Sequence, residues 1–174
     1  MVEIFPLAML ASSEVETILD AAFGAARRER TAYRLRAGMA AIPALSFAAT
    51  LDGIAVGTVQ CWPIVHVGDG GIVTPLVMVG PVAVSPRMQQ RGLGRRLMDA
   101  VMAAAAGHAD GALMMIGDPE YYGRFFGFSA EHTSAWRLPG PVEAHRLLAV
   151  AVAGHGVPGA PGEIGPRGAA MLAW

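Results

Sequence analysis

"SPRMQQRGLGRRLMDAV", residues 85–101, joins a strand-like apolar run to the start of an amphipathic helix. Gly92 and Gly94 permit positive φ and carry no side chain, so several backbone N–H groups can converge on one point. The start of a helix adds further N–H donors and a partial positive charge, which together favour phosphate. Four arginines in the stretch add bidentate donors. We therefore predict an anion site here; the alternative is a glycine-containing turn before a solvated basic helix start.

The stretch differs from two common phosphate loops. No G-x-x-x-x-G-K-[ST] motif is present, and "GLGRRL" (92–97) lacks the third glycine of a dinucleotide-binding turn. No acidic residue stands about 20 residues further on in a second strand, where such folds bind the ribose. Neither a P-loop nor a dinucleotide-binding fold is expected.

The preceding strand, "LVMVGPVAV" (76–84), is interrupted by Gly80–Pro81. Because proline cannot donate to a strand ladder, we expect the pairing to loosen or bulge there. The backbone of residues 82–84 would then be open to an extended ligand that carries amides. The alternative is an edge-strand proline without a ligand. A ligand with a pyrophosphate at one end and an amide-bearing arm at the other is coenzyme A.

The composition limits the class of protein. The chain has 174 residues, a net charge of -1, 53% hydrophobic and 16% charged residues, and one cysteine. This argues against disorder, a nucleic-acid binder, a disulfide and a cysteine-rich metal site. The longest apolar stretch, residues 72–84, is too short and too broken to span a bilayer, and the start lacks the features of a signal peptide. A cytoplasmic protein without a membrane partner is expected.

The order of the expected elements predicts an α/β fold with one mixed sheet, formed by a single domain over residues 1–174. Ser12 or Ser13 is expected to cap a helix over 12–29, and Asp52–Gly53 to close a hairpin over 44–66. The remaining expected segments are a strand at 3–9, a strand ending at Val84, a helix from Leu93, a strand at 112–116, a helix at 119–126, strands within 132–138 and 146–152, and an irregular Gly/Pro-rich segment over about 154–170.

Residues 80–94 also carry a family resemblance. "GPVAVSP" followed by "QQRGLG" (89–94) resembles the Q/R-x-x-G-x-G/A signature of the GCN5-related N-acetyltransferases. "LSFAATLDGIAVGTVQCWPI" (45–64) and "GDPEYYGRFFGF" (117–128) extend the resemblance over most of the chain, which looks like the bacterial YhbS-type branch. The resemblance implies a mostly antiparallel sheet with a splayed fourth and fifth strand, flanking helices, and acetyl-CoA as cosubstrate.

The resemblance also implies how this cosubstrate is held. The backbone of Val82 and Val84 would pair with the pantetheine arm, and the N–H groups of residues 91–95 would surround the pyrophosphate, with Gln89 shaping the loop. The implied cofactor-binding residues are Val82, Ala83, Val84, Gln89, Gln90, Arg91, Gly92, Leu93, Gly94 and Arg95.

Acetyl transfer requires a neutral amine and a proton for the departing thiolate. By the resemblance, a tyrosine on the short helix over 119–126 supplies this proton. Related chains place it four residues before the glycine of the G-F pair, but that position here is Gly123. We therefore assign the role to Tyr122, with Tyr121 in reserve; the alternative is that both rings only pack the helix against the sheet.

The general base is less defined, because the strand over 73–84 contains no carboxylate. Asp118, Glu120, His66 and Asp69 are candidates, each with a capping, turn or solvated role as the alternative. The histidines lack metal-ligand spacing, and no metal is expected. The expected acceptor is an amine of a small molecule, peptide or protein, and a homodimer is left open. A non-catalytic acyl-CoA sensor with the same fold remains the alternative function. The stretch "ARRERTAYRLRAG" (26–38) is basic and is expected to be a solvated helix end; the alternative is a basic wall that favours an acidic acceptor.

Overall fold

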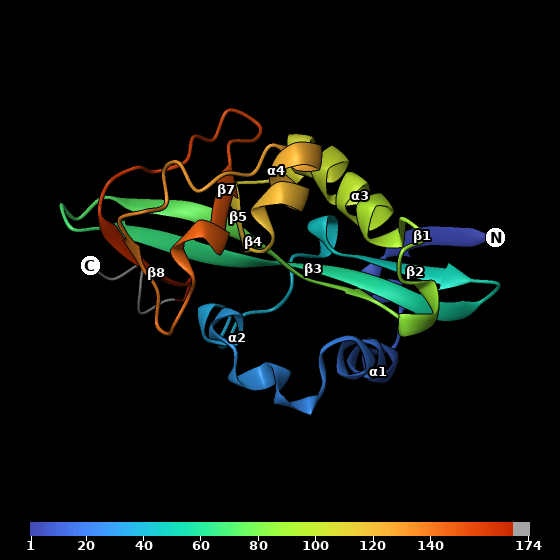
Figure 1. The fold of residues 1–174 in the computed structure, drawn as a ribbon. Helices are drawn as coiled ribbons and strands as arrows, with labels where there is room; N and C mark the ends of the chain where they lie inside the picture. The colour runs from blue at the N-terminus through green and yellow to red at the C-terminus, as the bar shows by residue number, and fades with distance from the viewer. Residues whose placement is uncertain (169–174) are drawn as a thin grey trace. The chain divides into compact units, whose positions relative to one another are not determined.

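The computed structural model describes residues 1–168 (Figure 1). The chain divides into two compact units. Unit 1 comprises residues 1–29, 41–61 and 79–108, and unit 2 comprises residues 30–40, 62–78 and the chain from 109 onward. The interpretation of the whole chain as one domain stays a prediction.

The strands form a mixed, eight-stranded sheet, as the element order predicts. They are β1 (Val2–Pro6), β2 (Phe47–Leu51), β3 (Ile54–Gly68), β4 (Val73–Val84), β5 (Ala112–Ile116), β6 (Trp136–Arg137), β7 (Leu147–Val150) and β8 (Gly162–Pro166). The order is β1-β2-β3-β4-β5-β7, and β8 pairs with β3 and β6. The pairs β4–β5 and β6–β8 are parallel, and β1–β2, β2–β3, β3–β8 and β5–β7 are antiparallel.

Four α-helices accompany the strands in the described part of the chain: α1 (Ser12–Phe23), α2 (Thr31–Leu35), α3 (Leu93–His108) and α4 (Pro119–Phe126). Short 3-10 segments lie between them, including η2 (Ala25–Glu29) and η4 (Pro86–Met88). None of the helices in residues 1–168 has the length and apolarity to cross a membrane.

The hairpin between β2 and β3 has the predicted turn in unit 1. Asp52 and Gly53 both take positive φ, +50° and +81°, as a primed two-residue turn requires. The register shifts between Ala49 and Thr50, which leaves Val56 as an extra residue in β3. The carbonyl of Val56 accepts a hydrogen bond from the Ser85 N–H at 2.8 Å. The bulge therefore holds the chain where β4 ends and the predicted anion loop begins.

Helix α1 is shorter than predicted and differs at its start. Its N-cap is Ala11, without a side-chain cap, so the assignment of Ser12 or Ser13 is wrong. The helix ends at Gly24, whose φ of +79° reverses the chain into η2. One face of the helix is apolar: Val15, Ile18 and Leu19 are buried in a cluster that also contains Leu7, Ala48 and Ala83.

Unit 2 has a core of its own, which contains Leu35, Ile64, Leu76, Met114, Trp136, Leu147 and Ile164. The side chain of Arg167 fixes the end of β8 to this unit. Its Nε donates to the Ile64 carbonyl at 3.1 Å, its Nη2 donates to the Leu76 carbonyl at 2.7 Å, and it pairs with Asp110. Three backbone segments are thereby joined by one guanidinium group.

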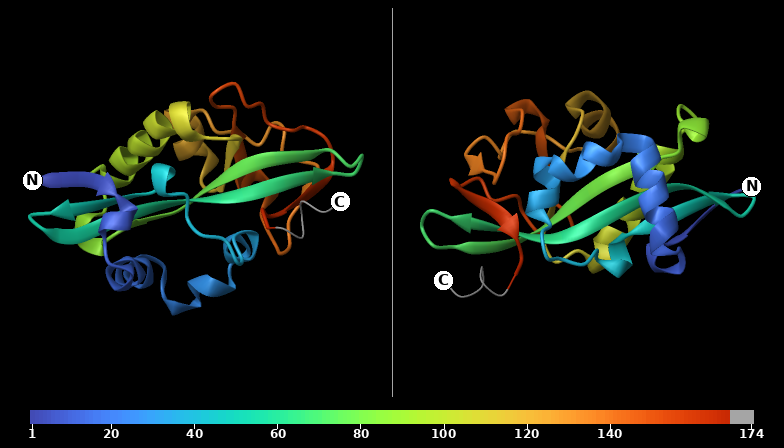
Figure 2. Two further views of the ribbon diagram at one scale, coloured as in Figure 1. Left: turned by 180° about the vertical axis from the view of Figure 1, so that it is seen from behind. Right: turned by 90° about the horizontal axis from the view of Figure 1, so that it is seen from below.

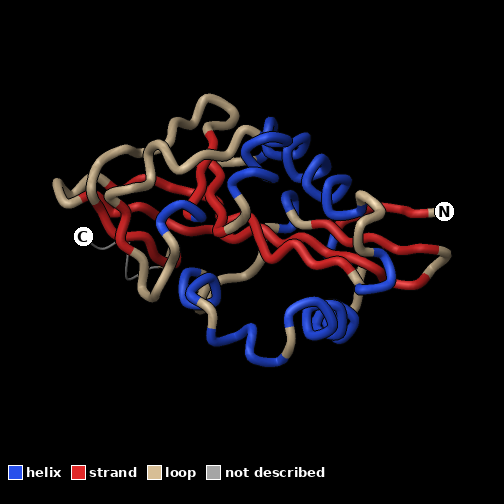
Figure 3. Tube along the Cα trace, viewed as in Figure 1, coloured by secondary structure: helices blue, strands red, loops and turns tan. Residues whose placement is uncertain are grey.

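Two predictions about solvated segments are wrong in part: residues 162–166 form a strand, and Arg27 and Arg36 are buried, although the other arginines of the basic stretch are exposed. The Gly/Pro-rich tail contains β8, which pairs with β3 from Ile64↔Pro166 to Gly68↔Gly162. Figure 2 shows two further views of this strand. Figure 3 draws the chain between β7 and β8 as loop, as expected. In the basic stretch, Arg27 is 1% and Arg36 is 9% exposed, because carboxylates and aromatic rings, respectively, cover their guanidinium groups.

Candidate active site

The predicted anion loop lies in unit 1, between β4 and α3. The strand β4 runs without a break through Gly80–Pro81, whose peptide bond is cis, and its parallel pairing with β5 covers Leu76 to Met78. After the strand, η4 makes one tight turn, and the Met88 N–H donates to the Ser85 carbonyl at 2.8 Å. Met88 is buried and anchors the loop, whereas residues 89–92 are exposed.

The backbone of the loop twice enters the left-handed region, at Gln90 (φ +63°) and Gly92 (φ +72°). Gly92 therefore has the predicted role. Gly94 does not, because it belongs to α3; a Cβ there would lie 3.8 Å from Val84 Cγ2, an ordinary contact. Alternation of left-handed and other residues turns successive N–H groups toward a common point and makes an anion-binding concavity.

Helix α3 adds donors to this concavity. The Arg96 N–H donates to the Gly92 carbonyl at 3.1 Å, which opens the hydrogen-bond ladder of the helix. The N–H groups of residues 93–95 precede this bond, so they have no acceptor within the helix. Leu93 and Leu97 are buried and hold the first turns of α3 on the sheet.

Gly57 on β3 makes this close seating possible, and the sequence reasoning missed it. A Cβ at Gly57 would lie 3.1 Å from Leu97 Cδ1 and 3.2 Å from both Leu93 Cδ2 and the Ala83 carbonyl oxygen. Such distances are tighter than most real contacts, so a side chain would displace α3 or the end of β4. A lone glycine within the β-rich run "IAVGTV" (54–59) was the available signal.

The residues predicted to bind the cofactor differ in exposure. Ala83 is fully buried, Val82, Val84 and Gly94 are half-buried, and Gln89, Arg91 and Arg95 are exposed. All lie in unit 1 with the loop. Arg96 is directed elsewhere, because its Nη2 donates to the Val2 carbonyl of β1 at 3.3 Å.

Helix α4, in unit 2, begins and ends as predicted. Asp118 caps it by accepting a hydrogen bond from the Glu120 N–H at 3.0 Å, and Pro119 occupies the first turn. Gly127 ends the helix with φ +75°, where only glycine is unstrained. The cap gives Asp118 a structural role, and Glu120 is exposed.

Tyr121 and Tyr122 lie in a group of aromatic rings on this helix. Their own ring centroids are 4.9 Å apart in an edge-on arrangement, and the Tyr122 ring also contacts Phe126 and Phe128. Burial, followed by the nearby Tyr121 and Asp118, raises the pKa of Tyr122 to about 12. The Tyr122 hydroxyl has no hydrogen-bond partner among residues 1–168. Tyr122 is thus a protonated donor with a vacant hydroxyl.

The other two candidate bases, His66 and Asp69, also lie in unit 2, and each already contacts another group of the protein. His66 is 2% exposed, and its Nε2 lies 3.0 Å from the Ala160 carbonyl oxygen. Asp69 accepts hydrogen bonds from Arg137 at 2.5 and 3.1 Å, and these lower its pKa. A carboxylate with a lowered pKa is a weaker base, which argues against Asp69, and burial together with the contact to the Ala160 carbonyl argues against His66 as the general base.

Cys61 is fully buried, and burial raises the pKa of its thiol, so it is a core residue and not a nucleophile. Within the described residues, no three His, Cys, Asp or Glu side chains are grouped as a metal site would need.

Solved structures with the same fold come from several bacteria. A GNAT family N-acetyltransferase (YhbS) from Escherichia coli, in complex with CoA, has a TM-score of 0.71 at 21% identity, covering 96% of this chain and 89% of that chain. A GNAT family acetyltransferase from Brucella melitensis, in complex with acetyl-CoA, has a TM-score of 0.68 at 24% identity, covering 98% of each chain. At these identities the likeness establishes the fold. No protein with a curated description matches the chain.

The sequence itself matches a family model. The model of the acetyltransferase (GNAT) family covers residues 13–128, which begin in α1 and end just after α4. This segment contains the anion loop, the first turns of α3 and both candidate tyrosines, and it is more than half of the chain. The chain therefore belongs to the acetyltransferase (GNAT) family.

Proposed function

We propose that this protein transfers the acetyl group of acetyl-CoA directly to an amine of its acceptor, within a ternary complex. The observation that carries the proposal is the loop of residues 89–95, in which two residues with left-handed backbone are followed directly by the first turn of α3. This arrangement fits a pyrophosphate. Two proteins of the same fold, from Escherichia coli and Brucella melitensis, were solved with CoA and acetyl-CoA.

In this proposal the N–H groups of residues 91–95 surround the pyrophosphate, and Gln89 and Gln90 shape the turn. The backbone of Val82, Ala83 and Val84 pairs with the amides of the pantetheine arm, in the manner of an added strand. The exposed Arg91 and Arg95 contribute less than the backbone, because exposed charge pairs are worth about 0–1 kcal/mol each.

The reaction moves one proton from the amine to the sulfur. The amine nitrogen attacks the thioester carbon, a C–N bond forms, the C–S bond breaks, and the departing thiolate requires a proton. Tyr122 is the proposed donor, because its hydroxyl is protonated at neutral pH, as in an ordinary tyrosine, and burial raises its pKa further, to about 12. A thiol has a pKa of about 8.5, so complete transfer from a phenol near 12 is uphill. We therefore expect the hydroxyl to act mainly by donating a hydrogen bond to the developing thiolate.

No carboxylate lies on β4, and the four candidate bases are a helix cap, an exposed side chain, a buried histidine and an ion-paired aspartate. The proposal therefore includes no side-chain base. The acceptor amine enters in its neutral form, or it loses its proton to water. Turnover should accordingly rise with pH toward the pKa of the acceptor, about 10.4 for a lysine-like amine.

The loop is tested by thermal shift with CoA and with acetyl-CoA. Gly92→Val should remove the ligand-induced rise in the unfolding midpoint, because valine cannot hold a φ of +72°. Gly70→Val is the matched control: it changes an open turn position in unit 2, and a Cβ there meets nothing within 4 Å. A full ligand-induced rise in Gly92→Val would contradict the loop assignment.

The chemistry is tested by release of the CoA thiol from acetyl-CoA over a panel of amines. Tyr122→Phe should lower kcat about 100-fold with little change in acetyl-CoA affinity, because the hydroxyl acts in the transition state. If Tyr121→Phe gives the larger loss, that residue is the donor. Binding of acetyl-CoA without thiol release for any amine would favour the non-catalytic sensor.

A further inference from the structure

Gly117 joins β5 to the N-cap of α4, and its backbone is fixed on both sides. Its N–H donates to the Arg146 carbonyl at 3.0 Å, and its own carbonyl accepts from Arg146 Nε at 3.3 Å. Gly117 is buried, and its φ lies outside the left-handed region. The backbone at this position would therefore accept any residue, and the reason for a glycine has to be steric.

The side chain of Tyr122 supplies that reason. A Cβ at Gly117 would lie 2.8 Å from both Cδ2 and Cε2 of the Tyr122 ring. Carbon atoms in contact are about 3.5–4.0 Å apart, so a methyl group here would push the ring away by several tenths of an ångström or more. The ring occupies the space that a side chain at Gly117 would fill.

Other aromatic rings lie next to the half-buried Tyr122 ring. Tyr121 lies edge-on to it, and the Phe126 and Phe128 rings lie 6.3 and 6.4 Å away between centroids. The Tyr122 backbone is also held, because its N–H donates to the Asp118 carbonyl at 2.9 Å and its carbonyl accepts from the Phe128 N–H at 3.3 Å. Gly117 thus lies next to the Tyr122 ring, and the ring's other neighbours named here are aromatic.

We propose that Gly117 is a positioning residue, which sets where the Tyr122 hydroxyl lies when the thiolate departs. This inference rests on the proposed function. The hydroxyl stands at the far end of the ring, so a small tilt at the Gly117 contact becomes a larger displacement of the oxygen. A displacement of about 1 Å in a reacting group costs up to about 100-fold in rate.

A double-mutant cycle tests the proposal, with kcat measured on the best amine of the panel at saturating acetyl-CoA. Gly117→Ala should lower kcat about 10-fold and change acetyl-CoA affinity less than about 3-fold. In the Tyr122→Phe background, the same alanine should change kcat less than about 2-fold, because the displaced ring no longer carries a hydroxyl. Gly107→Ala, a helical position with nothing within 4 Å of the added Cβ, should match the parent protein.

Each outcome separates this inference from the proposed function. If Tyr122→Phe alone loses activity but Gly117→Ala does not, or Gly117→Ala costs the same factor in both backgrounds, the positioning role is wrong and the acid assignment survives. If Tyr122→Phe keeps full turnover, the acid assignment is wrong and the inference falls with it. If Gly117→Ala destabilises the protein, the fall in the unfolding midpoint that it causes is measured both in the parent protein and in the Tyr122→Leu background. A smaller fall in the midpoint in the Tyr122→Leu background supports the contact between Gly117 and the Tyr122 ring, and an equal fall contradicts it.

Discussion

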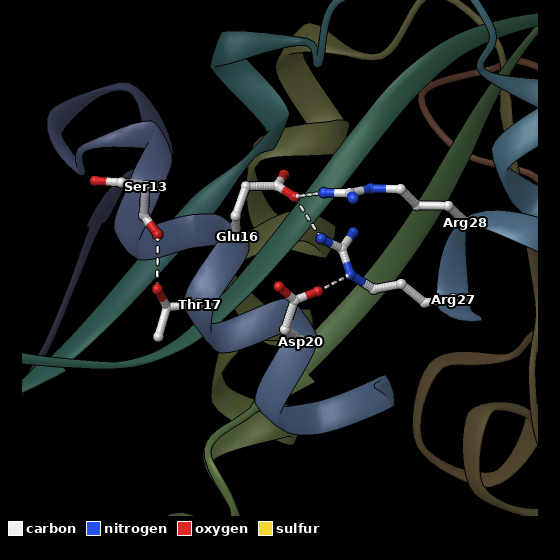
Figure 4. Close-up of polar contacts among 6 residues, drawn as sticks. All are labelled: Ser13, Glu16, Thr17, Asp20, Arg27 and Arg28. Atoms are coloured by element: carbon white, nitrogen blue, oxygen red, sulfur yellow. Dashed lines mark hydrogen bonds and ion pairs between the residues drawn. The ribbon is translucent and has the colours of Figure 1, made fainter. Parts of the chain in front are cut away.

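The buried guanidinium of Arg27 offers a sharp test of what holds the N-terminal segment of unit 1 together. Arg27 lies on η2 and is 1% exposed, although its partners on α1, Glu16 and Asp20, have side chains that are 47% and 51% exposed (Figure 4). Its Nη2 pairs with Glu16, and its Nε donates to Asp20 Oδ1 at 2.9 Å. Arg28, which is 64% exposed, also pairs with Glu16 at 2.7 Å.

Arg27→Met keeps most of the buried stem and removes the charge. Both carboxylates are about half exposed, so each ion pair is expected to contribute about 1 kcal/mol at most, the upper end of the range for exposed pairs. The loss of both pairs should therefore lower the free energy of unfolding by about 1–2 kcal/mol. Arg27→Ala also removes two buried methylenes, which adds about 1.6 kcal/mol at about 0.8 kcal/mol each. Arg28→Met should cost less than about 0.5 kcal/mol, because its side chain is exposed.

The assay is urea unfolding of the four proteins at pH 7 and again at lower pH. Desolvation opposes ionisation of Glu16, but Arg27 and Arg28 together outweigh it and lower its pKa in the folded protein. The contribution of Glu16 is therefore fully present above its unfolded pKa of about 4.3 and is lost as pH falls through the folded value. The difference in the free energy of unfolding between the parent and Arg27→Met should become smaller below about pH 4. Equal losses for Arg27→Met and Arg28→Met at pH 7 would refute the reasoning.

Three further predictions concern unit 2 and the core. Gly162→Ala should destabilise the protein by about 1–3 kcal/mol, because the added Cβ would lie 2.5 Å from His66 Nε2; Gly159→Ala, 3.9 Å from its nearest neighbour, should be close to neutral in the same denaturant assay. Arg167→Met should cost at least about 2 kcal/mol by thermal or urea unfolding, because the Ile64 and Leu76 carbonyls lose a charged donor. Cys61 should react with a thiol reagent only at the rate of unfolding; fast labelling of the native protein would contradict its burial.

Local chemistry alone predicted several elements with their limits. The residues of α4 and β5 agree with the expected 119–126 and 112–116, because Asp118, Pro119 and Gly127 mark the helix ends and the strand is a short apolar run between turns. The β2–β3 turn follows from Asp52–Gly53 in the same way. In each case the determining interaction is made within a few residues, so the sequence contains it.

The backbone of the loop over residues 89–95 was predicted only in part, and its binding of an anion stays a prediction. The left-handed conformations belong to Gln90 and Gly92, whereas Gly94 is helical. Glutamine does not signal positive φ, and Gln90 lies between Met88 and Leu93, which are both buried. The helix cap at Ala11 was equally hidden, because alanine carries no capping group.

What the tertiary structure decided concerns partners that are distant in sequence. Residues 162–166 have the composition of a loop, yet they form β8, because the β3 backbone from Ile64 to Gly68 supplies its hydrogen bonds. Arg27 has the character of a solvated residue until α1 brings carboxylates over it. Gly117 appears as an ordinary turn glycine until the Tyr122 ring occupies its missing side chain. The sequence determined the local elements and the family; burial and close approach arise only when remote segments meet, because no short window of sequence contains both sides of such a contact.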